Sequence, residues 1–147
     1  MRPTVHIKKL DPRATLPTYG SPSAAGADLY ALLDAPVTLA PGETVKIPTG
    51  LSLELPEGYA GLIYARSGLS VKRGLAPANK VGVIDADYRG EVLVALYNQS
   101  PAPQTVEPCE RIAQLVIAPV LQVDFEECEE LSDTLRGEGG FGSTGTK

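Results

Sequence analysis

Glycine and proline interrupt this chain so often that few stretches run ten residues without one of them. The 147 residues include 15 Gly and 13 Pro, and both residues destabilise the interior of a helix. The apolar residues between the interruptions are rich in Val, Leu, Ile and Ala, with two Phe, six Tyr and no Trp. Such a sequence favours many short strands joined by turns over long helices.

Alternating apolar and polar residues predict about ten strands between these turns. Residues 81–84 and 91–98 flank a turn at 85–90 and are predicted to pair as a hairpin, and the one short helix is expected at 67–73. Strands at this spacing are typical of an all-β sandwich or barrel, and we expect a jelly-roll-like arrangement. The other strands are expected at 5–8, 27–33, 37–40, 44–47, 51–55, 59–65, 111–117 and 120–125.

The last part of the chain differs in composition from the rest. Residues 126–134 are acidic, and residues 136–147 are rich in glycine. We therefore expect one β domain over residues 1–135 and a flexible C-terminal arm over residues 136–147. Hydrophobic residues make up 43% of the chain, which is enough for a core of ordinary size.

Charge and cysteine content narrow the classes of function. A net charge of −5 argues against a nucleic-acid polymer as a partner, because binding a polymer relies on a basic surface. A small anion remains possible, since a few arginines and a metal can reverse the field inside one pocket. Cys109 and Cys128 are isolated and His6 is the only histidine, which argues against a structural zinc site. With no apolar signal region and no membrane-length stretch, we expect a cytoplasmic protein that does not enter membranes.

The segment 25–30 places Asp28 between a glycine and the start of an apolar strand. A hydrated Mg²⁺ keeps several waters and needs few protein ligands, so this carboxylate could hold one. A turn Asp beside a strand is the simpler interpretation when the segment is considered alone.

Arg66, Ser67 and Gly68 stand at the start of the predicted helix. Ser67 occupies the expected N-cap position, so free backbone N–H groups there would face an anion, and Arg66 would add a bidentate phosphate donor. An ordinary capped helix with an exposed arginine explains the segment equally well.

The segment 79–90 is centred on Asp85. Its Asp-x-Asp spacing is similar to that of a calcium-binding loop, but Arg89 and Leu96 stand where two of the ligands are needed, which excludes that site. An Asp at the end of an apolar strand can instead be a general base, because a hairpin fixes it where water can approach. Simple turn chemistry is the alternative, since Asp and Gly are common turn residues.

The segment 110–116 carries Arg111 and Gln114 in a predicted strand. Their spacing puts the two side chains on opposite faces, so that one would line a pocket while the other makes an ion pair. A structural strand with a buried polar pair is the simpler interpretation.

The segment 136–145 sets one aromatic residue, Phe141, among five glycines. Its glycine spacing is similar to that of a phosphate-binding P-loop, but Ser143 stands where that loop needs Lys. An arm of this composition could still close on a nucleotide, with Phe141 stacked on a base and with Arg136, Ser143 and Thr144 on phosphate oxygens. A disordered tail is the alternative.

In this order and at this spacing, the five segments resemble the five signature motifs of the trimeric dUTPase family. The similarity covers nearly the whole chain, and five ordered motifs are far more specific than any one of them. It implies a jelly-roll homotrimer that hydrolyses dUTP to dUMP and pyrophosphate with the help of Mg²⁺. This reaction would remove dUTP from the nucleotide pool and supply dUMP for dTMP synthesis. In such a trimer one chain provides the first, second and fourth motifs of a site, a neighbour provides the third, and the arm of the third chain closes it.

The resemblance also implies roles in phosphate chemistry. Asp85 would activate water for in-line attack on the α-phosphorus, and Asp28 would hold Mg²⁺ through its waters. The triphosphate would be bound by Arg66, Ser67, Gly68 and Gln114, with Arg136, Ser143 and Thr144 closing over its γ end.

By the same resemblance, the 79–93 hairpin would read the nucleoside. Tyr88 would pack under the deoxyribose and leave no room for a 2′-hydroxyl, and Phe141 would cap the base. Uracil would be recognised by Asn79 and by backbone groups near Val83, Ile84 and Leu93.

Two residues depart from the family's usual sequence, and neither has a catalytic role. Ala65 stands where the family usually has Pro, and Glu138 adds a negative charge to the arm.

Two other functions remain as alternatives. A dCTP deaminase shares the fold but needs a Glu acid/base that no segment matches, and a non-catalytic nucleotide-binding or capsid-like jelly roll is expected to lack Asp85 or the arm.

Overall fold

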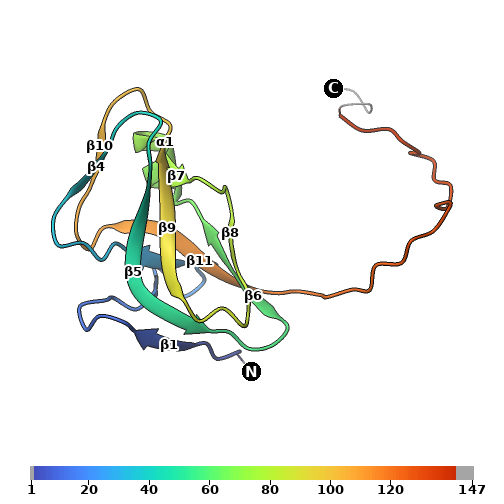
Figure 1. Cartoon of the computed structure of the whole chain (residues 1–147), viewed down its shortest axis with the longest axis horizontal. Coiled ribbons are helices and arrows are strands. Elements are labelled where there is room, and N and C mark those ends of the chain that lie inside the picture. Colours follow the sequence, from blue (N-terminus) through green and yellow to red (C-terminus); the bar gives the residue numbers. More distant parts are fainter. Residues whose placement is uncertain (1, 142–147) are drawn as a thin grey trace.

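The computed structural model describes residues 2–141, which form antiparallel sheets and one short helix (Figure 1). The all-β fold predicted from the sequence is confirmed. The elements are β1 (His6–Lys9), β2 (Thr18–Tyr19), β3 (Ala27–Tyr30), β4 (Val37–Leu39), β5 (Thr44–Glu54), β6 (Tyr59–Tyr64), α1 (Ser67–Arg73), β7 (Leu75–Pro77), β8 (Gly82–Ile84), β9 (Glu91–Asn98), β10 (Gln104–Val106) and β11 (Arg111–Pro119).

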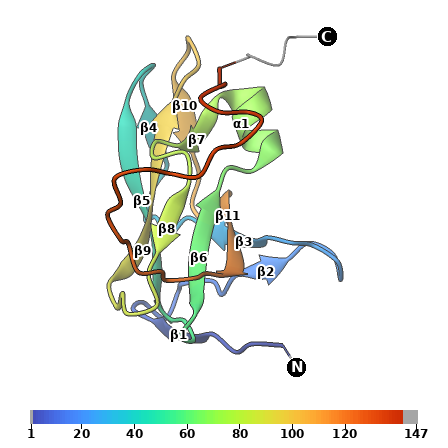
Figure 2. The same cartoon turned by 90° about the vertical axis from the view of Figure 1, so that its right-hand side faces the viewer.

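Two larger sheets and one small sheet make up the body. Their strand orders are β1-β5-β9-β7, β2-β3-β11-β6-β8 and β10-β4. In Figure 2, β5 and β9 lie to one side of β6 and β11. Buried aliphatic side chains of both larger sheets form one cluster, with Ile47, Val94 and Leu96 from one sheet and Ile63 and Leu115 from the other. Removing these side chains from water is the main stabilising contribution to the fold.

The helix α1 occupies the range predicted from the sequence. It buries Leu69 in the core and ends at Gly74, whose left-handed conformation (φ 66°) closes the last turn. Arg73 in that last turn contacts the carboxylate of Glu110, which ties the helix to the segment leading into β11. The part of the chain that the structure describes has no helix long and apolar enough to span a membrane.

The predicted hairpin around residues 85–90 is wrong. β8 pairs with β6 in the five-stranded sheet, whereas β9 pairs with β5 and β7 in the four-stranded sheet. The 85–90 segment therefore crosses from one sheet to the other. The alternation of apolar and polar residues identifies a strand but not its partner. Strands that are consecutive in the sequence often pair with each other, but not always.

The strand predicted at residues 120–125 is also absent. β11 continues to Pro119, and residues 120–141 contain no helix or strand. Figure 1 shows this segment leaving the body, so its apolar side chains meet no sheet edge, and Leu121 and Phe125 are 92% and 96% exposed. The domain division after residue 135 stays a prediction.

Candidate active site

A row of polar side chains crosses three strands of the five-stranded sheet. Gln114 of β11 pairs with Asp28 of β3 on one side and with Tyr64 of β6 on the other. Residues directly opposite one another in antiparallel strands point to the same face of the sheet. The register therefore brings the segments 25–30 and 110–116, which are far apart in the sequence, to one face.

Asp28 joins two arginines at this face. Its Oδ1 accepts a hydrogen bond from Nε of Arg66 at 2.7 Å, and its Oδ2 accepts one from Nη1 of Arg111 at 3.3 Å. The Asp28 side chain is only 13% exposed, so solvent and salt screen these ion pairs less than they would at an open surface. Two guanidinium groups and one carboxylate leave the cluster with net positive charge, which favours a phosphate ligand.

The expectation that Arg111 and Gln114 lie on opposite faces is wrong. β11 pairs with β3 at Arg111↔Tyr30 and at Gln114↔Asp28, and the register shifts between these pairs. Such a bulge adds one residue to a strand and reverses the alternation beyond it, so both side chains share the face of Asp28. The residue alternation carries no mark of this bulge, and the placement of Arg111 at Asp28 therefore emerges only from the structure.

The carboxamide of Gln114 connects the segment 25–30 to the start of α1. Its Nε2 donates a hydrogen bond to the carbonyl of Ala65 at 2.9 Å. Its Oε1 lies only 2.4 Å from where a Cβ on Gly26 would stand, so residue 26 has no room for a side chain. Because the contact uses the backbone carbonyl, Ala65 makes it as well as a proline could.

Ser67 and Gly68 are exposed in the first turn of α1. The N-cap is Arg66 (φ −88°, ψ 130°), which makes no side-chain capping bond, and Ser67 is the first helical residue. The prediction of Ser67 as the N-cap is therefore wrong by one position, a common error at helix ends. With no side-chain cap, the first-turn N–H groups beside Arg66 are available to an anion.

A second group of predicted residues lines a cavity of about 230 Å³ between β8 and β9. Its lining contains Asn79, Val83, Ile84, Asp85, Tyr88 and Leu93, all of which were predicted to read the nucleoside or activate water. It also contains Ile63, Gly82, Glu91 and Val92, which the sequence analysis missed. Ile63 reaches the cavity because β6 pairs with β8, and nothing in the local sequence reveals that pairing.

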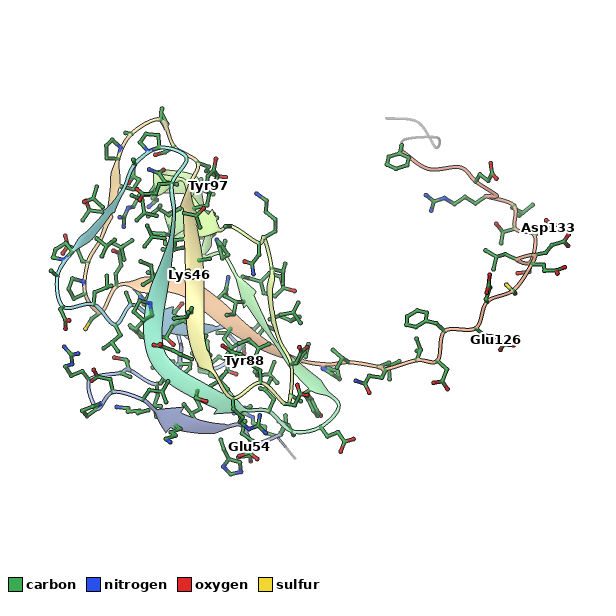
Figure 3. All side chains as sticks on the ribbon, viewed as in Figure 1. Lys46, Glu54, Tyr88, Tyr97, Glu126 and Asp133 are labelled. Atoms are coloured by element: carbon green, nitrogen blue, oxygen red, sulfur yellow. The ribbon has the colours of Figure 1, made fainter. Side chains whose placement is uncertain are left out.

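Tyr88 is held against the backbone at the rim of this cavity. Its hydroxyl donates a hydrogen bond to the carbonyl of Glu91 at 3.0 Å. A Cβ on Gly90 would lie 2.3 Å from that hydroxyl, so the tyrosine occupies the space that only glycine leaves free. Figure 3 places Tyr88 near the end of β9 at which the chain arrives from the 85–90 segment.

Within one chain, the Asp28 cluster and the cavity lie toward opposite edges of the five-stranded sheet. Asp28 is on β3 and the cavity begins at β8, with β11 and β6 between them. Three strand spacings put about 14 Å between β3 and β8. A ligand that contacts both groups in a single chain would have to span this distance.

Residues 136–141, the described part of the arm, join neither group. The Arg136 side chain donates to the carbonyl of Gly139 at 2.7 Å, and Phe141 is fully exposed. Ser143 and Thr144 lie outside the described residues.

The residues around Asp28 fit a cation that is held mainly by water and phosphate. No group of three or more His, Cys, Asp or Glu side chains within residues 2–141 could hold a metal directly. The Asp28 carboxylate has lone pairs beyond those that the arginines occupy, so it can accept hydrogen bonds from metal-bound water. Two adjacent guanidinium groups repel a bare cation, so the arrangement suits Mg²⁺ arriving with a polyphosphate.

Sequence comparison gives a consistent result. The model of the dUTPase family matches residues 12–145. Proteins named deoxyuridine 5'-triphosphate nucleotidohydrolase are 50% identical in Janthinobacterium sp. (strain Marseille), covering 97% of both chains, and 54% identical in Desulfitobacterium hafniense (strain Y51), covering 95% of this chain and 93% of the relative.

Solved structures agree with the sequences. The dUTPase of Staphylococcus bacteriophage 80alpha with dUPNHPP superposes with a TM-score of 0.88 at 32% identity, over 97% of this chain and 98% of the phage chain. A mutant dUTPase of phage phi11 of S. aureus, described with a structural Mg(II) ion, gives 0.79 at 26% identity over 88% and 99% of the two chains. The family match over residues 12–145 spans the positions of both groups of site residues. The chain belongs to the dUTPase family.

Proposed function

We propose that the chain hydrolyses dUTP to dUMP and pyrophosphate, and so removes dUTP from the nucleotide pool and supplies dUMP for dTMP synthesis. The observation that carries this proposal is the cavity between β8 and β9, which collects Asp85, Tyr88 and two open strand edges in one place. The phage relative bound to dUPNHPP supports the choice of nucleotide.

The open strand edges suit recognition of uracil. Within residues 2–141, β8 pairs only with β6, and β9 pairs with β7 only from Leu96 to Asn98. Backbone N–H and C=O groups near Val83 and Leu93 are therefore left without strand partners beside the cavity. Backbone groups at fixed positions can imitate a pairing base, and the side-chain amide of Asn79 adds a donor and an acceptor.

Tyr88 accounts for selection of the sugar. Its ring is held between the Gly90 backbone and the cavity, so a ribose 2′-hydroxyl would meet an aromatic face with no hydrogen-bond partner. Burying a hydroxyl without a partner is unfavourable, so the site favours deoxyribonucleotides.

The Asp28 cluster and the neighbouring start of α1 account for binding of the triphosphate. Arg66 and the N–H groups of Ser67 and Gly68 form an electropositive start to α1, and Gln114 lies beside them. Bidentate guanidinium contacts and helix N–H groups are well suited to phosphate oxygens. Mg²⁺, when bound with the triphosphate, would neutralise part of its charge, and Asp28 would accept hydrogen bonds from the metal's waters.

Asp85 is the proposed general base. It lies at the cavity where β8 ends, is exposed to water, and is fixed by the turn in which its carbonyl accepts the N–H of Tyr88 at 3.1 Å. Its carboxylate would orient a water molecule and remove its proton as the oxygen attacks the α-phosphorus in line with the departing pyrophosphate.

A trimer with shared sites would unite the separated groups. The Asp28 cluster of one copy would face the Asp85 cavity of a second, and Arg136, Phe141, Ser143 and Thr144 of a third would close the site. Two features within residues 2–141 support assembly: the exposed apolar side chains of the segment 120–125, and a groove of about 1010 Å³ lined in part by the partly exposed side chains of Val5, Ile7, Leu16 and Ile117. Exposed apolar side chains such as Leu121 and Phe125 can mark a protein–protein contact site.

Incubation of the purified protein with dUTP, dCTP and UTP in the presence of Mg²⁺ tests the proposal, with products separated by anion-exchange chromatography. We expect dUMP and pyrophosphate from dUTP. Release of ammonia from dCTP would indicate a deaminase, and binding without turnover would indicate a non-catalytic relative. Reaction in ¹⁸O-labelled water should place the label in dUMP, and label in pyrophosphate would contradict attack at the α-phosphorus.

A further inference from the structure

We propose that Glu91 is a positioning residue for Tyr88, and that a bulge in β5 thereby sets the discrimination between deoxyribonucleotides and ribonucleotides. The inference rests on the proposed function, because it concerns how the same cavity selects its sugar.

Three residues of β5 stand opposite a single residue of β9. Pro48 pairs with Leu93 and Ser52 pairs with Glu91, which leaves residues 49–51 facing Val92. The bulge depends on Gly50, which has φ +69° and whose Cβ, if it had one, would lie 2.6 Å from a methyl carbon of Leu32. This backbone turns the Gly50 N–H out of the regular ladder and makes it available to a side chain.

Glu91 uses that N–H and also holds Tyr88. Its Oε1 accepts a hydrogen bond from Gly50 N at 2.8 Å, while its backbone carbonyl accepts one from the Tyr88 hydroxyl at 3.0 Å. The side-chain bond fixes Glu91 to β5, and the backbone carbonyl of the same residue holds the Tyr88 hydroxyl. The position of the tyrosine therefore depends on how Glu91 is held. The cavity wall is thus connected to the four-stranded sheet through Glu91.

Two further side chains of β5 hold the backbone on either side of Glu91. Thr49 Oγ1 donates to the carbonyl of Val92 at 2.7 Å, and Ser52 Oγ donates to the carbonyl of Arg89 at 2.6 Å. Both side chains belong to buried residues. They restrain a segment that crosses between sheets without a strand partner of its own.

If Glu91 had a purely structural role, replacing it would change the stability of the protein and nothing else. A second glutamate of the chain provides a matched control. Glu43 also bonds a backbone N–H with its side chain, from Ala40 at 2.7 Å in the turn between β4 and β5. Glu43 does not line the cavity between β8 and β9. Replacing either glutamate removes one carboxylate–backbone bond, but only the bond of Glu91 leads to Tyr88.

The test compares kcat/KM for dUTP and UTP in wild type, Glu91→Leu, Glu91→Gln and Glu43→Leu. Glu91→Leu loses the acceptor, and the dUTP/UTP ratio should fall roughly three- to tenfold, mainly through a lower KM for UTP. Glu91→Gln keeps an acceptor oxygen and should keep the wild-type ratio. Glu43→Leu should lower the melting temperature and leave the ratio unchanged.

A double-mutant cycle with Tyr88→Phe tests the connection itself. Phe keeps the ring and removes the hydroxyl, so Glu91→Leu should change the ratio less in the Tyr88→Phe background than in wild type. Additive effects would refute the relay. If Glu91→Leu does not fold, Ser52→Ala releases the same segment at Arg89 and should lower the ratio, and an unchanged ratio would then overturn the proposal.

The outcomes separate this inference from the proposed function. A wild-type protein that hydrolyses no dUTP would refute the proposed function. An active wild type whose dUTP/UTP ratio survives Glu91→Leu would refute only the role of Glu91.

Discussion

The Oε1 of Gln114 fills the space in which a side chain on Gly26 would begin, only 2.4 Å from the position of its Cβ. The same carboxamide donates to the carbonyl of Ala65 at 2.9 Å. Gln114 therefore joins the segment 25–30 to Ala65, the residue just before Arg66, and its position depends on the absence of a single methyl group.

Gly26→Ala should displace Gln114 and weaken the phosphate side of the site. We expect kcat/KM for dUTP to fall roughly ten- to hundredfold, because a displacement of about 1 Å in a binding group has effects of this size. Gly20→Ala is the matched control, since nothing lies within 4 Å of a Cβ at Gly20. Equal activity of Gly26→Ala and wild type in steady-state assays would show that Gln114 does not depend on Gly26.

Local signals in the sequence were sufficient for the helix and most of the longer strands, but not for the short strands β2, β7 and β10 or for the pairing of the strands. The helix at 67–73 and most strands follow from residue alternation and from the positions of Gly and Pro, both of which act within a few residues. The partner of β8 is set by contacts with β6, and the bulge in β11 is set by packing between strands, so neither leaves a local mark. The bulge in β5 is marked in the sequence only by Gly50, and a glycine inside a strand does not by itself fix the register.

The candidate site divides in the same way. Asn79, Asp85 and Tyr88 stand close in the sequence, and the structure gathers them at one cavity. Arg111 joins Asp28 only through the bulge of β11, and Ile63 joins the cavity only through strand pairing. Long-range register is thus what the sequence analysis lacked.

Asp11 should make the stability of the folded protein depend measurably on pH in the acid range. Hydrogen bonds from the Arg13 side chain and backbone lower the pKa of Asp11 from 3.8 to about 2. A lowered pKa in the folded state stabilises the protein above pH 3.8, and this contribution disappears as the pH falls toward 2. Wild type should therefore be more stable than Asp11→Asn at pH 5, and the difference in urea unfolding should vanish near pH 2. A difference that does not change over this range would contradict the role of charge.

Asp85→Asn keeps the size of the side chain and removes the base. We expect turnover of dUTP to fall by ~10²–10⁴ or more, with the affinity for a non-hydrolysable dUTP analogue largely kept. Single-turnover kinetics and equilibrium titration measure the two quantities separately. Asp87→Asn, two residues away in the same turn, is the control and should change turnover little. Near-normal turnover in Asp85→Asn would remove Asp85 from the mechanism.

Deletion of residues 136–147 should leave the fold intact and cripple turnover. Residues 136–138 and Phe141 are exposed, so their loss removes little buried apolar surface, and the melting temperature should stay close to that of wild type. Loss of Arg136 and Phe141 removes a phosphate donor and a base-stacking group from the proposed closed site. Full activity of the truncated protein in a dUTP assay would refute the role of the arm.

Mixing the two inactive proteins tests whether one site draws on different chains. In the proposed trimer, Asp85 and the arm of any one site come from different copies, so a site is complete when a truncated chain provides Asp85 and an Asp85→Asn chain provides the arm. Random 1:1 assembly in a closed three-fold ring leaves roughly a quarter of the sites complete. Co-refolding Asp85→Asn with the truncated protein should therefore recover about that share of wild-type turnover, whereas each protein refolded alone should recover none. If Asp85 and the arm of a site came from the same chain, every site in the mixture would lack one of them. Mixed trimers verified by native mass spectrometry but lacking activity would refute the shared site, and the hydrolysis of dUTP by wild type would still stand.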